Sequence, residues 1–164
     1  MLKVEKLSKV FYDRHGEEIH AVKDLSFECQ TNEIVAVLGM NGAGKSTTLR
    51  MLSTVISPSA GSASLDDLQL FDDPQKARHK IGILTGSTGL YKKITARETL
   101  DFFGQVNDMP KEKRKAKIEE LVKLLDMAEI IDRKCEKLST GQKQKVNIAR
   151  TILHEPSLLI LDEA

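Results

Sequence analysis

Hydrophobic residues follow two different patterns along this chain of 164 residues. Over residues 2–4 and 19–27 they alternate with polar residues, which is typical of strands with one buried face. The stretch between them, residues 13–16, is rich in turn-forming residues. Residues 34–38 and 158–161 are instead continuous apolar runs, as in parallel strands that are covered on both faces. We therefore predict antiparallel strands at the N-terminus and a parallel sheet formed by later segments.

Helical periodicity lies in the second half of the chain, after a further predicted strand at 81–84. Residues 92–137 are predicted to be helical, and one helix there has a single apolar face made of Ile118, Leu121, Val122 and Leu125. A later helix has apolar side chains at helical spacing, at Val146, Ala149, Ile152 and Leu153. Thr95 with Glu98, and Ser139 with Gln142, have the spacing of capping boxes, so helices are expected to begin at these two positions.

Residues 39–46 match the phosphate-loop pattern G-x-x-x-x-G-K-[ST] at every fixed position. They follow the predicted strand 34–38 and precede a segment, 47–52, that can continue as a helix. Glycines allow consecutive backbone N–H groups to turn around phosphate oxygens, and a helix N-terminus favours the same anion. Lys45 can reach the β- and γ-phosphates, and the Ser46 hydroxyl can bind Mg²⁺. We predict that a nucleoside triphosphate is bound by Gly39, Asn41, Gly42, Ala43, Gly44, Lys45, Ser46 and Thr47.

Two carboxylates, Asp162 and Glu163, directly follow the apolar run 158–161. Ligands of open α/β sheets bind beyond the carboxyl ends of the strands, so these acids are expected beside the phosphates. Asp162 would hold Mg²⁺, directly or through water, and Glu163 would polarise the attacking water. An acidic turn without catalytic function is the alternative, and the upstream phosphate loop disfavours it.

The order of the motifs resembles that of ATP-binding cassette (ABC) ATPases: a phosphate loop, then Leu-Ser-x-Gly-Gln at 138–142, then an apolar strand that ends in Asp-Glu. The resemblance covers the whole chain. It implies an α/β P-loop NTPase fold with antiparallel β elements at the N-terminus and a helical subdomain. In that family the signature motif of one subunit contacts the γ-phosphate of ATP held by the partner subunit. Here the resemblance assigns that motif to Ser139, Thr140, Gly141 and Gln142.

The same resemblance implies that an aromatic side chain stacks on adenine. Phe11 aligns best and Tyr12 second, and a plain core aromatic is the alternative. Residues 1–164 would form one ABC ATPase domain, with a nucleotide-binding core part (1–91), a helical subdomain (92–137), and the signature helix and last strand (138–164).

The function implied by the resemblance is hydrolysis of ATP, with Mg²⁺, to power a membrane transporter. The ATPase would work as a pair of subunits and drive a separate transmembrane permease from the cytoplasmic face of the cell membrane. The pattern over 89–98, Gly-Leu-Tyr-x-x-Ile-Thr-Ala-Arg-Glu, resembles exporter-type ATPases, particularly the sodium-extrusion and multidrug branch.

Three features depart from the usual pattern of the family. Thr140 stands where a second glycine is common, and Gly86 stands where a glutamine links Mg²⁺ to the permease interface. The third is the histidine that senses the γ-phosphate, which would lie beyond Ala164 and cannot be His15, His20, His79 or His154. We therefore expect a domain that is incomplete at its C-terminal end, with doubtful ATPase activity as an isolated chain.

Composition narrows the classes of function. The formal net charge of +1 provides no broad basic field, so no nucleic-acid partner is expected. No apolar run approaches the roughly 20 residues of a membrane span, and residues 1–5 alternate like a strand and lack the apolar region of a signal peptide. Cys29 and Cys135 are far apart and fit reduced thiols in a cytosolic protein.

Other functions remain open as alternatives. A non-transport ABC ATPase of DNA maintenance would carry long coiled coils, and residues 46–138 contain no sustained heptads. A translation-type ATPase would carry two cassettes, and a simple nucleotide kinase leaves residues 138–142 unexplained. The basic run 111–117 is interpreted as a solvated helix face rather than a contact with anionic lipid. An inactive truncated fragment is the remaining alternative.

Overall fold

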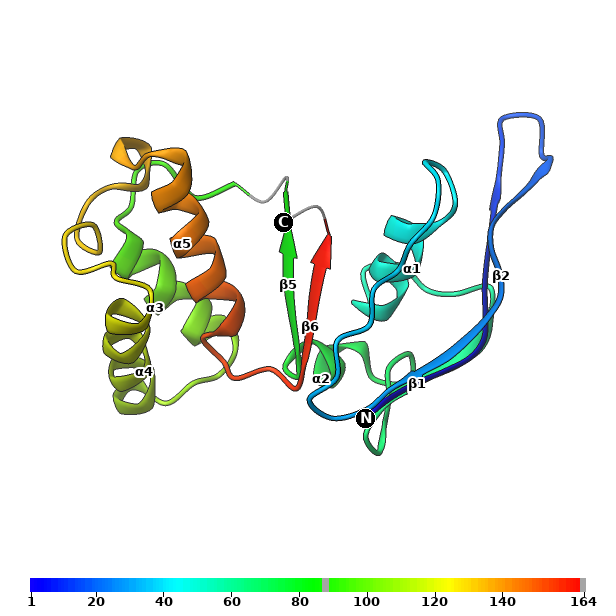
Figure 1. The fold of residues 1–164 in the computed structure, drawn as a ribbon, viewed down its shortest axis with the longest axis horizontal. Helices are drawn as coiled ribbons and strands as arrows, with labels where there is room; N and C mark the ends of the chain where they lie inside the picture. The colour runs from blue at the N-terminus through cyan, green and yellow to red at the C-terminus, as the bar shows by residue number, and fades with distance from the viewer. Residues whose placement is uncertain (87–88, 163–164) are drawn as a thin grey trace. The chain divides into compact units, whose positions relative to one another are not determined.

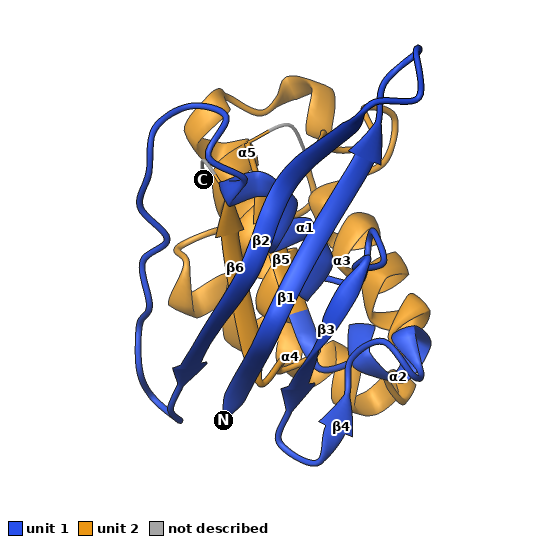
Figure 2. Ribbon diagram, turned by 90° about the vertical axis from the view of Figure 1, so that its right-hand side faces the viewer, with its two compact units in different colours: residues 1–81 blue, residues 82–164 orange. Residues whose placement is uncertain are grey.

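The computed structural model describes residues 1–86 and 89–162. They fall into two compact units, Met1–Ile81 and Gly82–Ala164, which Figure 2 colours separately. Glu163, the predicted general base, lies outside the described residues, as do residues 87–88 and 164. The mixture of helices and strands, with an antiparallel sheet near the N-terminus, confirms the predicted fold class.

The first unit is built on a sheet of four antiparallel strands in the order β2-β1-β3-β4 (Figure 2). Its strands are β1 (Leu2–Tyr12), β2 (Glu18–Cys29), β3 (Ala60–Leu65) and β4 (Leu68–Gln69). Helices α1 (Lys45–Leu52) and α2 (Pro74–Arg78) belong to the same unit. The antiparallel strands expected at the N-terminus are thereby confirmed.

A bulge interrupts the alternation of buried and exposed side chains along β1. The strand continues beyond residues 2–4, the segment in which the sequence shows that alternation. Lys6 has a φ of 48°, and the register against both neighbouring strands shifts beside it. Val4 and Leu7 are both buried, at 1% and 0% exposed, although an unbroken strand would point residues 4 and 7 to opposite faces. Beyond the bulge, Leu7, Lys9 and Phe11 share one face of β1.

The strand expected at residues 34–38 does not form. These residues belong to no strand of the described part of the chain, and Ile34 and Leu38 are 96% and 89% exposed. An apolar run becomes a strand only where a neighbouring strand completes its backbone hydrogen bonds. The sheet of this unit pairs β2 with β1 and leaves the following segment unpaired, so the prediction for 34–38 is wrong here.

The second unit contains β6 (Leu158–Asp162) and all but the first residue of β5 (Ile81–Thr85), and the two strands point in the same direction in Figure 1. β6 forms as predicted, but only Ile160 of its apolar side chains is buried, and Leu159 and Leu161 are 49% and 60% exposed. The expectation of burial on both faces is therefore wrong for β6. In the described chain β5 is its only neighbouring strand, so a large part of its surface has no cover.

Helices make the core of the second unit: α3 (Ala96–Val106), α4 (Lys111–Leu124), a 3₁₀ turn at Cys135–Lys137, and α5 (Thr140–Ile152). The predicted apolar faces are buried against one another, including Ile118, Leu121, Val146 and Ala149. Both capping boxes are present, at Thr95 with Glu98 and at Ser139 with Gln142. These helix starts are confirmed, and the two cysteines are free thiols.

Candidate nucleotide-binding site

The phosphate-loop sequence ends at the N-terminus of α1, with Gly44 as the N-cap and Lys45 as the first helical residue. The Lys45 ammonium donates hydrogen bonds to the carbonyl oxygens of Gly39 and Met40, at 2.8 and 2.9 Å. The backbone N–H of Ala43 donates to the Met40 carbonyl at 3.1 Å. These contacts close residues 39–45 into a loop around the lysine side chain, although the strand expected before the loop is absent.

Gly44 connects this loop to the sheet. Its φ is +84°, a conformation that costs other residues about 1–2 kcal/mol. A Cβ added to Gly44 would lie 2.2 Å from the carbonyl oxygen of Ala21 and 3.1 Å from the Val22 side chain. The end of the phosphate loop therefore packs directly on β2, and only a glycine fits there.

The sheet register relates Phe11 to this packing. Val22 on β2 lies opposite Lys9 on β1, and side chains directly opposite each other share a face of the sheet. Phe11 lies two residues further along β1. The register against β2 shifts between Lys9 and Val10, but the Lys9 ammonium lies 5.2 Å from the centroid of the Phe11 ring, so the two side chains share a face, which is the face that Val22 presents to Gly44. Tyr12 points to the opposite face, where its hydroxyl lies 3.5 Å from a carboxylate oxygen of Glu18. Of the two aromatic candidates, Phe11 is the one that shares a face with the phosphate loop.

The predicted metal ligands lie in different units. Ser46 lies in the first turn of α1, and Asp162 ends β6, where its carbonyl oxygen accepts a hydrogen bond from the N–H of Gly86 at 3.1 Å. A hydroxyl and a carboxylate are the hard oxygen ligands that suit Mg²⁺. Within the described residues no three His, Cys, Asp or Glu side chains form a metal cage.

The Leu-Ser-x-Gly-Gln motif forms the N-terminus of α5. The Ser139 hydroxyl accepts a hydrogen bond from the N–H of Gln142 at 3.3 Å, and the Gln142 side chain accepts from the N–H of Ser139 at 2.9 Å. Ser139, Thr140 and Gly141 are exposed, and a Cβ added to Gly141 would meet no atom within 4 Å. No contact among the described residues requires a glycine at that position, and the helix N-terminus is open for an approaching group.

A buried arginine anchors the other end of this helix. Arg150 is 8% exposed, and its guanidinium lies 4.9 Å from the ring centroid of Phe103 on α3. Burial lowers the pKa of Arg150 below its ordinary value, and the aromatic face compensates part of the lost hydration. The signature helix is thus fixed to the helical core at its C-terminal turn.

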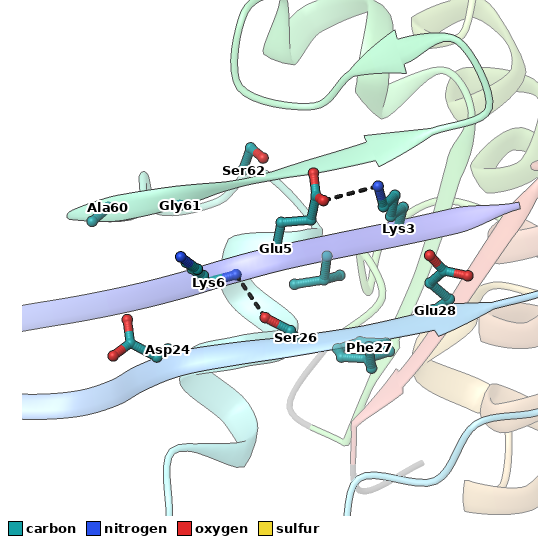
Figure 3. Close-up of a pocket in the computed structure, with 11 residues that line it drawn as sticks. Lys3, Glu5, Lys6, Asp24, Ser26, Phe27, Glu28, Ala60, Gly61 and Ser62 are labelled. Carbon is teal, nitrogen blue, oxygen red and sulfur yellow. Dashed lines mark hydrogen bonds and ion pairs between the residues drawn. The ribbon is translucent and has the colours of Figure 1, made fainter.

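A pocket of about 730 Å³ lies elsewhere on the first unit, over β1, β2 and β3 (Figure 3). Its charged side chains are partly used within the sheet, since Lys3 pairs with Glu5 at 2.8 Å. The N–H of Lys6 donates to the Ser26 hydroxyl at 2.8 Å, and Ser26 also lines the pocket. None of the predicted site residues lines this pocket, so it provides no support for nucleotide binding.

Sequence reasoning missed the residues that position the loop, Ala21 and Val22, because both look like ordinary strand residues. It also missed Lys9, whose spacing from Phe11 is the only available signal: residues two apart on a strand share a face. Three basic residues of the run 111–117 form ion pairs within the unit. Arg114 pairs with Asp101 at 2.6 Å, and Lys117 and Lys113 both pair with Glu155.

No helix in the described chain is long and apolar enough to cross a membrane.

Comparison with known proteins places these motifs in one family. The family model for the ABC transporter matches residues 22–164. The chain is 37% identical to the ABC transporter ATP-binding protein NatA of Bacillus subtilis, over 99% of this chain and 66% of NatA. It is 34% identical to the methionine import ATP-binding protein MetN 2 of Bacillus cereus, over 100% of this chain and 49% of that protein.

The fold agrees with solved structures. The dimeric, post-hydrolysis structure of the ATP-binding cassette MJ0796 bound to ADP and phosphate matches with a TM-score of 0.83 and 26% identity. That match covers 98% of this chain and 73% of the cassette. The chain spans just under two thirds of NatA and about half of MetN 2, so the family model carries the assignment. Because that model covers most of the sequence, from residue 22 to its last residue, the chain belongs to the ABC transporter family.

Proposed function

We propose that this protein is an ATP-binding and ATP-hydrolysing subunit that powers a membrane transporter. The observation that carries the proposal is the loop 39–45, closed around Lys45 at the N-terminus of α1 and seated on β2 through Gly44. A glycine-rich loop of this kind, with a lysine and a helix N-terminus behind it, is suited to bind a chain of phosphates. Phe11, on the same face of the sheet, would stack on the adenine ring.

The chemistry follows from residue types. Lys45 would exchange its two carbonyl partners for β- and γ-phosphate oxygens, which form stronger, charge-assisted hydrogen bonds. Mg²⁺, held by Ser46 and Asp162, would neutralise charge on the phosphates. Glu163 would accept the proton of the attacking water, the role of a general base.

A second subunit would complete the site. Ser139 accepts from Gln142 and keeps its own hydroxyl proton, which can be donated to a γ-phosphate held by the partner. The open space at Gly141 would admit that phosphate close to the first backbone N–H groups of α5. The MJ0796 cassette that this chain resembles is a dimer bound to ADP and phosphate, which supports the same arrangement.

A separate permease and the direction of transport are the finer parts of the proposal. We place the subunit at the cytoplasmic face of the membrane, on a transmembrane permease, with export as the direction. The exporter-like pattern at 89–98 supports export. The chain is also 34% identical to a methionine import subunit, so direction needs its own test: ATP-driven flux in oriented vesicles that contain the permease. Uptake into right-side-out vesicles would contradict export and leave the ATPase assignment intact.

The central experiment separates binding from hydrolysis in the full-length protein. Lys45→Ala should weaken ATP binding by about 10–150-fold, because a hydrogen bond to a charged group contributes roughly 1.5–3 kcal/mol. Glu163→Gln should keep ATP binding and slow hydrolysis by roughly 10²–10⁴-fold, the scale of a lost general base. Calorimetry measures the first variant and phosphate release the second. Unchanged ATP affinity in Lys45→Ala would refute the phosphate-loop assignment, and normal turnover in Glu163→Gln would remove Glu163 from its role.

A further inference from the structure

Lys9 holds an unusual position beside the aromatic candidate for base stacking. Its ammonium lies 5.2 Å from the centroid of the Phe11 ring, over one face of that ring. The same ammonium donates a 2.8 Å hydrogen bond to the carbonyl oxygen of Ser57. Both contacts come from one side chain on β1, so the cation is fixed at two points.

The segment that carries Ser57 is itself tied to β1. The N–H of Ser59 donates to the Ser8 carbonyl at 2.8 Å, and the Ser59 hydroxyl accepts from the N–H of Val10 at 3.0 Å. This segment follows α1, and its backbone N–H groups donate hydrogen bonds to the Arg50 carbonyl oxygen in the last turn of that helix. Lys9 therefore joins the Phe11 ring to the chain that leaves the phosphate-loop helix.

We propose that Lys9 is a positioning residue for the nucleotide base: its ammonium covers one face of the Phe11 ring and leaves the other face to stack on the adenine of ATP. The inference rests on the proposed function, because it requires that the phosphate loop binds ATP. Lys9 itself touches Phe11 and Ser57, and it acts on the base through the ring.

The physical reason lies in the charge distribution of the ring. An aromatic face is negative, so a cation above it is attracted and draws electron density towards itself. The opposite face becomes less negative, which reduces the repulsion between the ring and the π electrons of a stacked base. The fixed cation also limits rotation of the Phe11 side chain, so less motion is lost when the base binds.

Two other roles for Lys9 make different predictions. As a phosphate ligand, Lys9 would strengthen the binding of any polyphosphate, with or without a base. As a purely structural link to Ser57, it would change thermal stability and affect ATP binding equally whether or not residue 11 is aromatic.

A double-mutant cycle in the full-length protein distinguishes these roles. Equilibrium affinities for ATP and for inorganic tripolyphosphate are measured for wild type, Lys9→Met, Phe11→Leu and the double variant. Lys9→Met should weaken ATP binding by about 3–10-fold, the scale of one partly exposed cation–π contact. The same change should have no effect in the Phe11→Leu background, and tripolyphosphate affinity should stay the same in all four proteins.

Matched controls accompany the cycle. Lys9→Arg keeps a cation that can lie over an aromatic face and should bind ATP like wild type. Lys23→Met removes the same charge from the neighbouring strand β2 and should change nothing. Lys9→Gln repeats the loss of the cation with a polar side chain, in case the methionine variant folds poorly.

An equal loss of ATP affinity with and without the Phe11 ring would overturn the proposal, as would a parallel loss of tripolyphosphate affinity. Failure of the proposed function gives a different result: wild type and Lys45→Ala would then bind ATP equally weakly. In that case the four proteins of the cycle would not differ in ATP affinity.

Discussion

Two helix glycines of the second unit should respond in opposite directions to the same substitution. Gly104 lies in α3, and a Cβ placed there would fall 2.3 Å from Cδ and 2.6 Å from Cγ of Arg114 on α4. Arg114 is 8% exposed and cannot simply swing away, because it donates to Asp101 at 2.6 Å and to the Met109 carbonyl at 2.9 Å. Gly141 in α5 has open space at the same place.

The magnitudes follow from these contacts. Overpacking costs about 1–3 kcal/mol, and a buried polar group that loses its partner costs about 1–3 kcal/mol more. Alanine gains about 0.5–1 kcal/mol over glycine in a helix, which offsets part of this. We expect Gly104→Ala to lower the free energy of unfolding by about 2–4 kcal/mol, or roughly 4–16 °C in Tm for a protein of this size. Gly141→Ala should change it by between zero and a gain of about 1 kcal/mol.

Thermal and urea unfolding, followed by circular dichroism, measure both variants under identical conditions. The ATPase assay adds a second reading: Gly141→Ala should fold normally yet lose turnover, because its new methyl group lies where the partner's γ-phosphate would approach. Equal stability changes in the two variants would refute the steric argument for Arg114. Full turnover in Gly141→Ala would refute the proposed approach to α5.

Two further predictions concern the phosphate loop and an ion pair. Gly44→Ala should abolish ATP binding and destabilise the first unit, since its Cβ would strike the Ala21 carbonyl. Gly42→Ala, with φ of +82° but open space, should cost only about 1–2 kcal/mol, and equal effects of the two variants would contradict the packing on β2. Arg114 holds the pKa of Asp101 below its ordinary value, so the carboxylate stabilises the fold above about pH 4, and this contribution is lost as the pH falls through the lowered pKa. Asp101→Asn should therefore be less stable than wild type at pH 7 and approach it in urea unfolding as the pH falls below the lowered pKa of Asp101, and a gap that does not depend on pH would contradict this.

Local signals in the sequence predicted much of the helical unit. A capping box is specified by two residues three positions apart, and both predicted boxes are present. The apolar face from Ile118 to Val122 is buried as its spacing indicates. Each of these features depends on residues within one or two helical turns of one another, so the sequence pattern is sufficient to predict it.

The strand features that failed depend on partners distant in sequence. Residues 34–38 have the composition of a buried strand, but composition does not supply the neighbouring backbone that a strand requires. The bulge at Lys6 could not be predicted either, because a positive φ does not alter the pattern of hydrophobic and polar residues. In the candidate site, the sequence predicted the phosphate-loop residues and ranked Phe11 above Tyr12, but the face of the sheet that each aromatic side chain takes follows only from the register of β1 against β2. The roles of the individual site residues, Glu163 among them, stay predictions.

The capping box at Ser139 bears on how tightly two subunits would associate in the proposed dimer. Because Ser139 and Gln142 already hold each other, the exposed turn at the start of α5 is ordered before any partner arrives. Ordering a flexible side chain at an interface costs about 0.5–1.5 kcal/mol, and here that entropy is lost during folding rather than at docking. Breaking the box by Gln142→Ala would transfer this loss to the association step, so the dimer would require a higher protein concentration to form while each subunit kept its fold.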